Sequence, residues 1–173
     1  EDLRRALSEY AGCRPEEILA TNGGDEIINL ILNTFINPGD QVLTHGPTFD
    51  VYGIDAAVLG GQMIYCPDEE GFVRNAAAFK QLIVEKQPKV TFICNPNNPT
   101  GHIWPAAVIE EFVRAADNIV VVDEAYLEFA NQESVIPLIE KYENLIVIRT
   151  LSKAFGLAGF RLGYGVARAD MID

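Results

Sequence analysis

Short runs of apolar, often β-branched residues recur along the chain, and the segments between most of them space their apolar residues as helices do. The short runs predict strands, because they are bounded by turn residues and are too short for helices. They are ILAT at 18–21, QVLT at 41–44, MIYC at 63–66, VTFIC at 90–94, IVVVD at 119–123, LIVIR at 145–149 and LGYGV at 162–166. This pattern predicts a sheet of about seven strands.

Three of the intervening segments carry clear helix signals. DEIINLILNTFI is closed by Asn37, Pro38 and Gly39, AAAFKQLIVEK ends before Pro88, and PAAVIEEFVRAAD places Pro105 at a first-turn position. The opening EDLRRALSEYAG also has apolar residues at helical spacing. Nearly continuous apolar strands that alternate with helices indicate an α/β fold, with a mostly parallel sheet sandwiched between helices.

Composition narrows the class of protein. A length of 173 residues, 49% of them hydrophobic, with no visible linker or repeat, predicts a single domain over residues 1–173. The formal net charge of −12 disfavours nucleic acid and anionic membrane surfaces as partners. The longest uncharged stretch, residues 90–109, is interrupted by prolines and asparagines, so no membrane span is expected.

The three cysteines, Cys13, Cys66 and Cys94, lie far apart, and two of them fall in predicted strands. Their odd number and wide spacing argue against a disulfide framework and against a zinc site. Reduced thiols are typical of the cytosol. We therefore expect a cytoplasmic protein without a bound metal.

Polar residues follow the ends of the predicted strands, where ligands bind in sheets of this kind. After ILAT come Gly23 and Gly24, then Asp25 and Glu26 at the start of a helix. Glycines before a helix N-terminus let a phosphate approach free backbone N–H groups. The same residues also suit an ordinary tight turn whose acids stabilise the helix dipole.

Two further strand ends carry candidate ligand contacts. The loop NPNNPTG at 95–101 is stiff and offers Asn98 as a hydrogen-bonding side chain, although such a loop is also common without function. Asp123 ends a hydrophobic strand and needs a cationic partner, either a ligand cation or a basic side chain. A helix N-cap or a structural salt bridge is the alternative.

The last cluster follows LIVIR and contains Thr150, Ser152, Lys153 and Arg161. Hydroxyls and a guanidinium suit a phosphate dianion, which leaves Lys153 for covalent chemistry, with a solvated surface lysine as the alternative. Together the clusters provide an acid for a ring cation, a donor for a ring oxygen, an amine for a carbonyl and a cradle for a phosphate. This set describes pyridoxal 5'-phosphate.

Five motifs in order, NGGDE, HGPTFDVY, NPNNPTG, VVVDEAYLEF and RTLSKAFGLAGFRLGY, extend this interpretation over essentially the whole chain. With them the sequence resembles the fold type I pyridoxal-phosphate enzymes, and specifically their histidinol-phosphate aminotransferase branch. The resemblance implies the large-domain fold of these transferases and a homodimer. It also implies that relatives have an N-terminal arm and a C-terminal small domain, which we expect to lie outside residues 1–173.

The resemblance assigns roles to individual residues. It implies that Lys153 binds the cofactor covalently, that Asp123 pairs with the pyridine nitrogen, and that Asn98 and Tyr126 hydrogen-bond the ring 3-oxygen. Phe49, where the family usually has Tyr, would stack on the ring. The phosphate would be held by Thr150, Ser152 and Arg161 together with the backbone N–H groups of Gly24, Asp25 and Glu26.

The implied reaction is transfer of the amino group from histidinol phosphate to 2-oxoglutarate, which gives imidazole-acetol phosphate and glutamate in histidine biosynthesis. Three alternatives remain: a phosphothreonine decarboxylase-like enzyme, an aminotransferase of broader or aromatic range, and a noncatalytic pyridoxal-phosphate-binding domain. A nucleotide-binding domain is disfavoured because neither GxGxxG nor GxxxxGK[ST] occurs.

Overall fold

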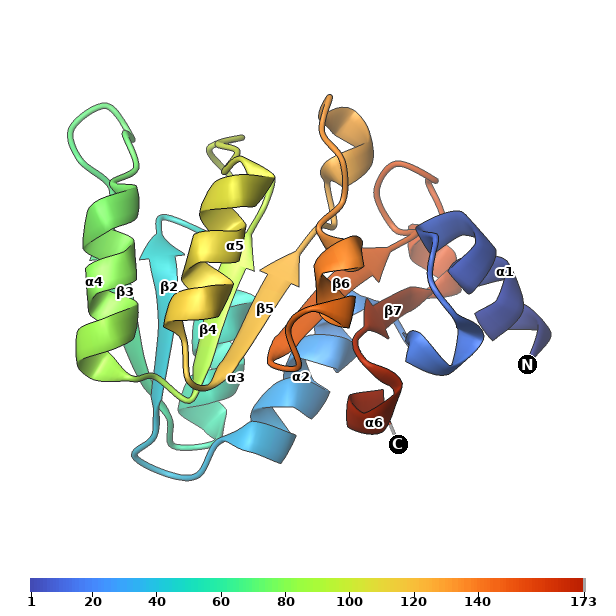
Figure 1. The fold of residues 1–173 in the computed structure, drawn as a ribbon, viewed down its shortest axis with the longest axis horizontal. Coiled ribbons are helices and arrows are strands. Elements are labelled where there is room, and N and C mark those ends of the chain that lie inside the picture. The colour runs from blue at the N-terminus through green and yellow to red at the C-terminus, as the bar shows by residue number, and fades with distance from the viewer. Residues whose placement is uncertain (173) are drawn as a thin grey trace.

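A seven-stranded sheet lies between two layers of helices in the computed structural model, which describes residues 1–172 (Figure 1). The strands are β1 Ile18–Thr21, β2 Gln41–Gly46, β3 Gln62–Pro67, β4 Val90–Cys94, β5 Ile119–Asp123, β6 Leu145–Thr150 and β7 Gly163–Val166. The α-helices are α1 Asp2–Ala11, α2 Gly24–Phe35, α3 Val51–Val58, α4 Ala76–Lys86, α5 Ala106–Ala115 and α6 Ala169–Ile172. Short 3₁₀ turns are Pro15–Glu17, Leu127–Phe129, Ile136–Glu140 and Ala158–Phe160.

The order of strands across the sheet is β1-β7-β6-β5-β4-β2-β3. Pairing is parallel from β3 through β2, β4 and β5 to β6, whereas β7 is antiparallel to both β6 and β1. The prediction of a mostly parallel, seven-stranded α/β sheet is confirmed. Because β7 is reversed, its first residue, Gly163, pairs with Thr21 and Thr150, the last residues of β1 and β6.

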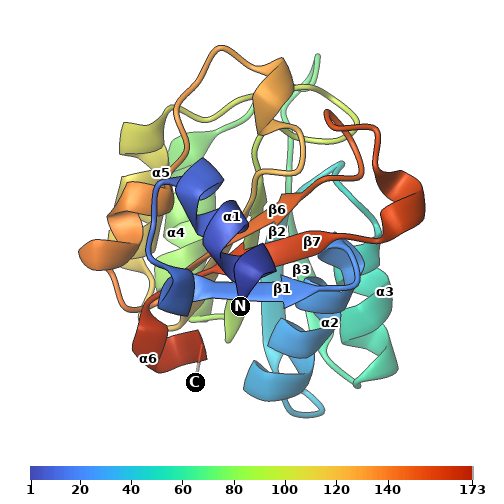
Figure 2. The same cartoon turned by 90° about the vertical axis from the view of Figure 1, so that its right-hand side faces the viewer.

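The central strands are apolar throughout because both faces of the sheet are covered. In β5, Val120 and Val122 belong to one core with α4 and α5, and Val121 belongs to the other with α2 and α3. Figure 2 shows α4 and α5 on one side of the sheet and α2 and α3 on the other. This arrangement leaves the carboxyl ends of the strands as one open edge, toward which the arrows of β2, β4 and β5 point in Figure 1.

Two details differ from the expected pattern. The sequence pattern did not predict α3, because its apolar residues run almost continuously and only Tyr52 and Ala56 are buried. Pro105 is the N-cap residue before α5, not a residue of its first turn.

Within residues 1–172, no helix has both the length and the apolar character needed to cross a membrane.

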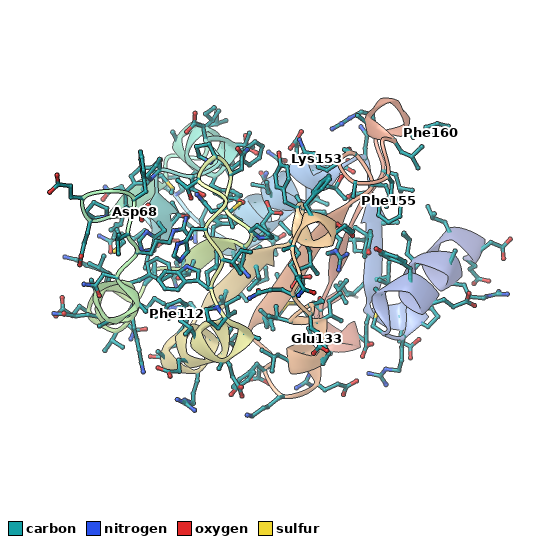
Figure 3. All side chains as sticks on the ribbon, turned by 90° about the horizontal axis from the view of Figure 1, so that it is seen from above. Asp68, Phe112, Glu133, Lys153, Phe155 and Phe160 are labelled. Atoms are coloured by element: carbon teal, nitrogen blue, oxygen red, sulfur yellow. The ribbon has the colours of Figure 1, made fainter. Side chains whose placement is uncertain are left out.

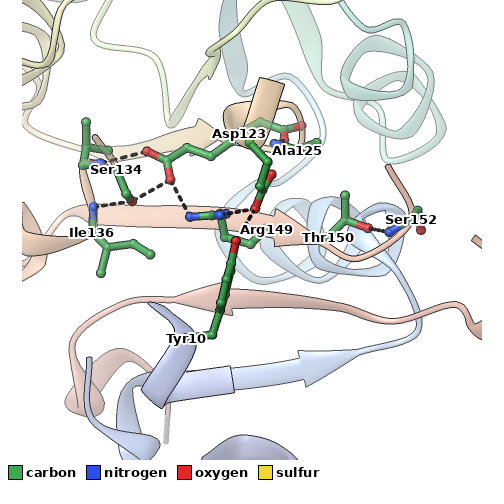
Figure 4. Close-up of polar contacts among 11 residues, drawn as sticks. Tyr10, Asp123, Ala125, Ser134, Ile136, Arg149, Thr150 and Ser152 are labelled. Atoms are coloured by element: carbon green, nitrogen blue, oxygen red, sulfur yellow. Dashed lines mark hydrogen bonds and ion pairs between the residues drawn. The ribbon is translucent and has the colours of Figure 1, made fainter. Parts of the chain in front are cut away.

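A buried ion-pair network lies on the face of the sheet that packs against α1 (Figure 4). Arg149 of β6 is 5% exposed and pairs with Glu124 at 3.3 Å and with Glu128. Glu124 also accepts a hydrogen bond from the Ser134 hydroxyl at 2.6 Å, and Glu128 accepts one from Tyr10 of α1 at 3.1 Å. The network therefore ties α1 and the segment after β5 to the centre of the sheet.

We expect Arg149→Met to lower the free energy of unfolding by about 3–5 kcal/mol, since it leaves Glu124 buried without its cationic partner. Urea unfolding at neutral pH measures the loss. Arg114→Met is the matched control, because Arg114 is exposed at the end of α5 and its change should be nearly neutral. Equal stabilities of the two variants would show that Arg149 does not hold this network.

Candidate functional site

A cavity opens at the carboxyl edge of the sheet, between the start of α2 and the ends of β4, β5 and β6. Figure 3 looks down on this edge and shows Lys153 there, with the loop that continues to Phe155 and Phe160. The residues that line the cavity are Gly24, Asp25, Ile28, Phe49, Cys94, Asn98, Asp123, Ala125, Tyr126, Ile148, Thr150, Ser152, Lys153 and Arg161. All the site residues expected from the sequence except Glu26 therefore meet in one cavity.

The turn between β1 and α2 forms one wall of the cavity. Gly23 is the N-cap of α2, with a φ of 91°, and within the described residues no side chain caps this helix end. The first N–H groups of a helix have no intrahelical acceptor, so this end is free to bind an anion. The φ of 91° is what requires a glycine here, and the Nη2 atom of Arg161 lies close to the position that a Cβ on Gly23 would take, at 2.6 Å.

Arg161 reaches this wall because β7 is antiparallel to its neighbours. It lies two residues before Gly163, and its guanidinium is 3.4 Å from Asp25 Oδ2 across the mouth of the cavity. Gly163 makes the approach possible: a Cβ there would come within 2.5 Å of the Gly23 carbonyl carbon. The guanidinium and the free N–H groups of α2 thus converge on one point, which suits a phosphate.

The hydroxyls after β6 have different surroundings. The Thr150 hydroxyl accepts a hydrogen bond from the Ser152 N–H at 3.1 Å and donates one to the Leu162 carbonyl at 3.3 Å. Within residues 1–172 the Ser152 hydroxyl makes no hydrogen bond, so it is available to a ligand. Thr150 therefore shapes the loop, and bonding to a ligand would replace its contact with Leu162.

Lys153 and Tyr126 face one another across the cavity, with Nζ of Lys153 5.3 Å from the centroid of the Tyr126 ring. Both residues line the cavity, and Lys153 is exposed. A flexible primary amine beside an open cavity can reach a bound carbonyl group. This placement fits the covalent role expected from the sequence.

The NPNNPTG loop uses its asparagines in two ways. Asn95 bonds the backbone of Trp104, with the Trp104 N–H donating to Oδ1 at 2.6 Å. Asn97 donates to the Pro47 carbonyl at 3.0 Å and accepts from the Thr48 hydroxyl at 2.7 Å. Within the part of the chain that the structure describes, the Asn98 side chain makes no hydrogen bond and lines the cavity. Of these three asparagines, Asn98 is thus the one whose side-chain amide is available to bind a ligand.

Asp123 forms the floor of the cavity and is 5% exposed. Its Oδ2 accepts a hydrogen bond from the Tyr52 hydroxyl at 2.6 Å, and its Oδ1 accepts one from the Ala125 N–H at 3.0 Å. Burial raises the pKa of Asp123 above its usual range, while these two donors oppose the shift. The carboxylate has no basic side chain in direct contact among residues 1–172, so a ligand cation would balance its negative charge.

Glu26 is the expected site residue that does not line the cavity. Its carboxylate accepts a hydrogen bond from the Asn22 N–H at 2.5 Å and so closes the turn before α2. Such a contact stabilises the helix start and leaves only the backbone N–H of Glu26 for an anion.

The sequence did not single out the Cys94 thiol and the apolar walls Ile28 and Ile148, which line the cavity, or Tyr52, which contacts Asp123 beneath it. Tyr52 lies in the HGPTFDVY motif three residues after Phe49. Its role is visible only once α3 is placed against β5. The motif itself is the signal that would have drawn attention to it.

Fold and site together define a class of protein: an α/β domain with an uncapped helix start, an arginine and a lysine around one cavity at the carboxyl edge of its sheet, which suits a phosphate-bearing ligand. The comparisons with known proteins agree with this class. Residues 1–173 match the family described as aminotransferase class I and II over their whole length, and the chain belongs to that family.

Relatives and solved structures add detail. The chain is 43% identical to a histidinol-phosphate aminotransferase of Thermoanaerobacter pseudethanolicus over 99% of its own length and 49% of that protein. The histidinol-phosphate aminotransferase of Sinorhizobium meliloti, solved in complex with pyridoxal-5'-phosphate, superposes with a TM-score of 0.90 at 29% identity, over 99% of this chain and 47% of that one. An L-threonine-O-3-phosphate decarboxylase of Porphyromonas gingivalis gives 0.82 at 25% identity, over 99% and 50% of the two chains. The chain spans about half the length of the curated relatives it matches.

We expect Gly163→Ala to lower the free energy of unfolding by about 1–3 kcal/mol, because the added Cβ meets backbone atoms that cannot give way. Gly159→Ala is the matched control, since a Cβ at Gly159 has nothing within 4 Å. Urea unfolding of both variants measures the difference. A Gly163→Ala protein as stable as Gly159→Ala would show that the turn at Gly23 and Gly24 does not depend on this close approach.

We expect Asp123→Asn to stabilise the ligand-free protein at pH 7 by about 1 kcal/mol, as substitutions in functional sites often do. The pKa of Asp123 is raised in the fold, so its favourable contribution is complete below the unfolded pKa and is lost as pH rises through the folded one. The stability gain should therefore be much smaller at pH 4 and should vanish below the unfolded pKa. Urea unfolding at the two pH values tests this, with the exposed Asp117→Asn as control.

Proposed function

We propose that the chain is the large, cofactor-binding domain of a pyridoxal-phosphate-dependent aminotransferase that acts on histidinol phosphate and 2-oxoglutarate. One observation carries the proposal: Lys153 and Asp123 line the same cavity as the uncapped start of α2. Identity of 40–44% to proteins named histidinol-phosphate aminotransferase supports the choice of substrate. The products are imidazole-acetol phosphate and glutamate.

The residues of the cavity fit pyridoxal 5'-phosphate. The start of α2 at Gly24 and Asp25, with Arg161 and Ser152, would hold the phosphate. Asn98 and Tyr126 would donate hydrogen bonds to the ring 3-oxygen, and Phe49 would pack on the ring face. Asp123 would meet the ring nitrogen, and Lys153 would hold the cofactor covalently. A ring cation would also balance the charge of the buried Asp123 carboxylate, which has no direct basic partner among residues 1–172.

When bound, the cofactor supplies an electron sink that stabilises negative charge at the α-carbon of an amino acid. The chain's own residues direct that chemistry. Asp123 keeps a proton on the ring nitrogen through its negative charge, and Arg161 with the α2 N–H groups fixes the position of the phosphate. Once the substrate amine has replaced it on the cofactor, the free Nζ of Lys153 would act as the base that removes the proton from the α-carbon, a contribution of about 10²–10⁴ in rate.

A phosphothreonine decarboxylase-like activity is the second candidate. The observation in its favour is the similarity to the decarboxylase of Porphyromonas gingivalis, at a TM-score of 0.82. The two reactions break different bonds at the α-carbon, and the cavity residues described above suit either. Residues that bind the substrate carboxylate would therefore decide between them.

We further propose that the protein is a cytoplasmic homodimer, as the resemblance implies.

The assignment is tested with the complete gene product by two measurements. Borohydride reduction of the cofactor-loaded protein and peptide mapping should place the cofactor mass on Lys153, and Lys153→Ala should abolish the label. Turnover should favour histidinol phosphate over phosphothreonine and aromatic amino acids presented in parallel. Release of carbon dioxide from phosphothreonine would move the protein to the decarboxylases, and a label on another lysine would refute the role of Lys153.

A further inference from the structure

Tyr52 lies beneath the cavity and is held in one position by its packing. It is 1% exposed, and its ring stacks on Phe92 of β4 at a centroid distance of 4.4 Å and an interplanar angle of 8°. The ring also meets Phe49 edge-on at 5.6 Å. A side chain confined in this way cannot swing its hydroxyl elsewhere without disturbing the core.

The hydroxyl of Tyr52 makes its hydrogen bond to Asp123, donating to Oδ2 at 2.6 Å. The Ala125 N–H donates to the other oxygen, Oδ1, at 3.0 Å. Two donors, one on each oxygen, fix the plane of the carboxylate. Burial and the charge of Asp123 raise the pKa of the Tyr52 phenol well above its usual value, so it stays protonated and remains a donor.

We propose that Tyr52 is a positioning residue whose hydroxyl keeps the Asp123 carboxylate charged and oriented toward the ring nitrogen of the cofactor. The inference rests on the proposed function, because it assumes that Asp123 meets that nitrogen. Tyr52 does not line the cavity and acts only through Asp123. By contacting Phe49 as well, its ring links the aromatic that would pack on the cofactor to the carboxylate below it.

Other groups around Asp123 cannot replace this donor. Asp25 of α2 is negative and opposes ionisation of Asp123, while Lys153, after β6, favours it more weakly than the hydrogen bond from Tyr52. The Cys94 thiol at the end of β4 is buried, and burial raises its pKa to about 12, so it stays neutral. Loss of the Tyr52 hydroxyl would therefore leave the Ala125 N–H as the principal group that keeps the carboxylate ionised.

Tyr52→Phe removes the hydroxyl and retains the ring that packs between Phe92 and Phe49. A hydrogen bond to a charged group is worth roughly a tenfold to hundredfold change in an equilibrium or rate. We expect the dissociation constant for pyridoxal phosphate to rise by about tenfold or more. The acid limit of cofactor binding should move up by about one to two pH units, because the carboxylate protonates more easily.

The kinetic effect should appear in kcat, with a fall of about tenfold to hundredfold and little change in KM, because Asp123 supports the chemical step and does not bind the substrate. Tyr164→Phe is the matched control. Tyr164 is also 1% exposed, its hydroxyl makes no hydrogen bond among residues 1–172, and it lies in β7 on the face of Arg149.

The experiment measures cofactor binding against pH, and kcat and KM, for the complete gene product and the two variants. Weaker, acid-sensitive binding in Tyr52→Phe, with Tyr164→Phe unchanged, supports the inference. If the parent protein binds cofactor and transaminates while Tyr52→Phe matches it, the role of Tyr52 is refuted and the proposed function stands. If the parent protein does not bind pyridoxal phosphate, both are refuted.

Discussion

A carboxylate at the end of a buried strand costs free energy unless hydrogen bonds and a cation share its charge. Asp123 is in that position at the centre of the sheet. Tyr52 and the Ala125 N–H supply hydrogen bonds to it, but no basic side chain of residues 1–172 is in contact with it. The carboxylate at the floor of the cavity therefore lacks a positive counter-charge, and this explains why a ligand with a cationic ring suits the site.

The two buried acids that follow one another along the chain, Asp123 and Glu124, have opposite environments. Successive side chains near a strand end point to opposite faces, so Asp123 faces the cavity and Glu124 faces the core near α1. Glu124 is fully satisfied by Arg149, Ser134 and a backbone N–H at Val135. One acid therefore stabilises the scaffold, while its neighbour is left for a ligand.

The reversed strand β7 connects the central sheet to the cavity at its carboxyl edge. Because β7 begins at the edge where β1 and β6 end, the loop before it delivers Arg161 to the uncapped start of α2. Gly163 allows its backbone to approach that of Gly23 and Gly24 more closely than any side chain would permit. This wall of the cavity thus depends on a contact between segments about 140 residues apart in sequence.

The sequence by itself determined the strands, most of the helices and the residues at the strand ends, because apolar runs and turn residues are local signals. It also determined which family the chain resembles, since five motifs kept their order. Tertiary structure alone decided which polar groups remain available: Asn98 is left for a ligand because Asn95 and Asn97 bond the backbone, and Thr150 is already engaged with Leu162. It also brought Tyr52 to Asp123, a contact between residues 71 positions apart that no local pattern encodes. Hydrogen-bond partners depend on the packing of distant segments, and packing follows from the whole fold.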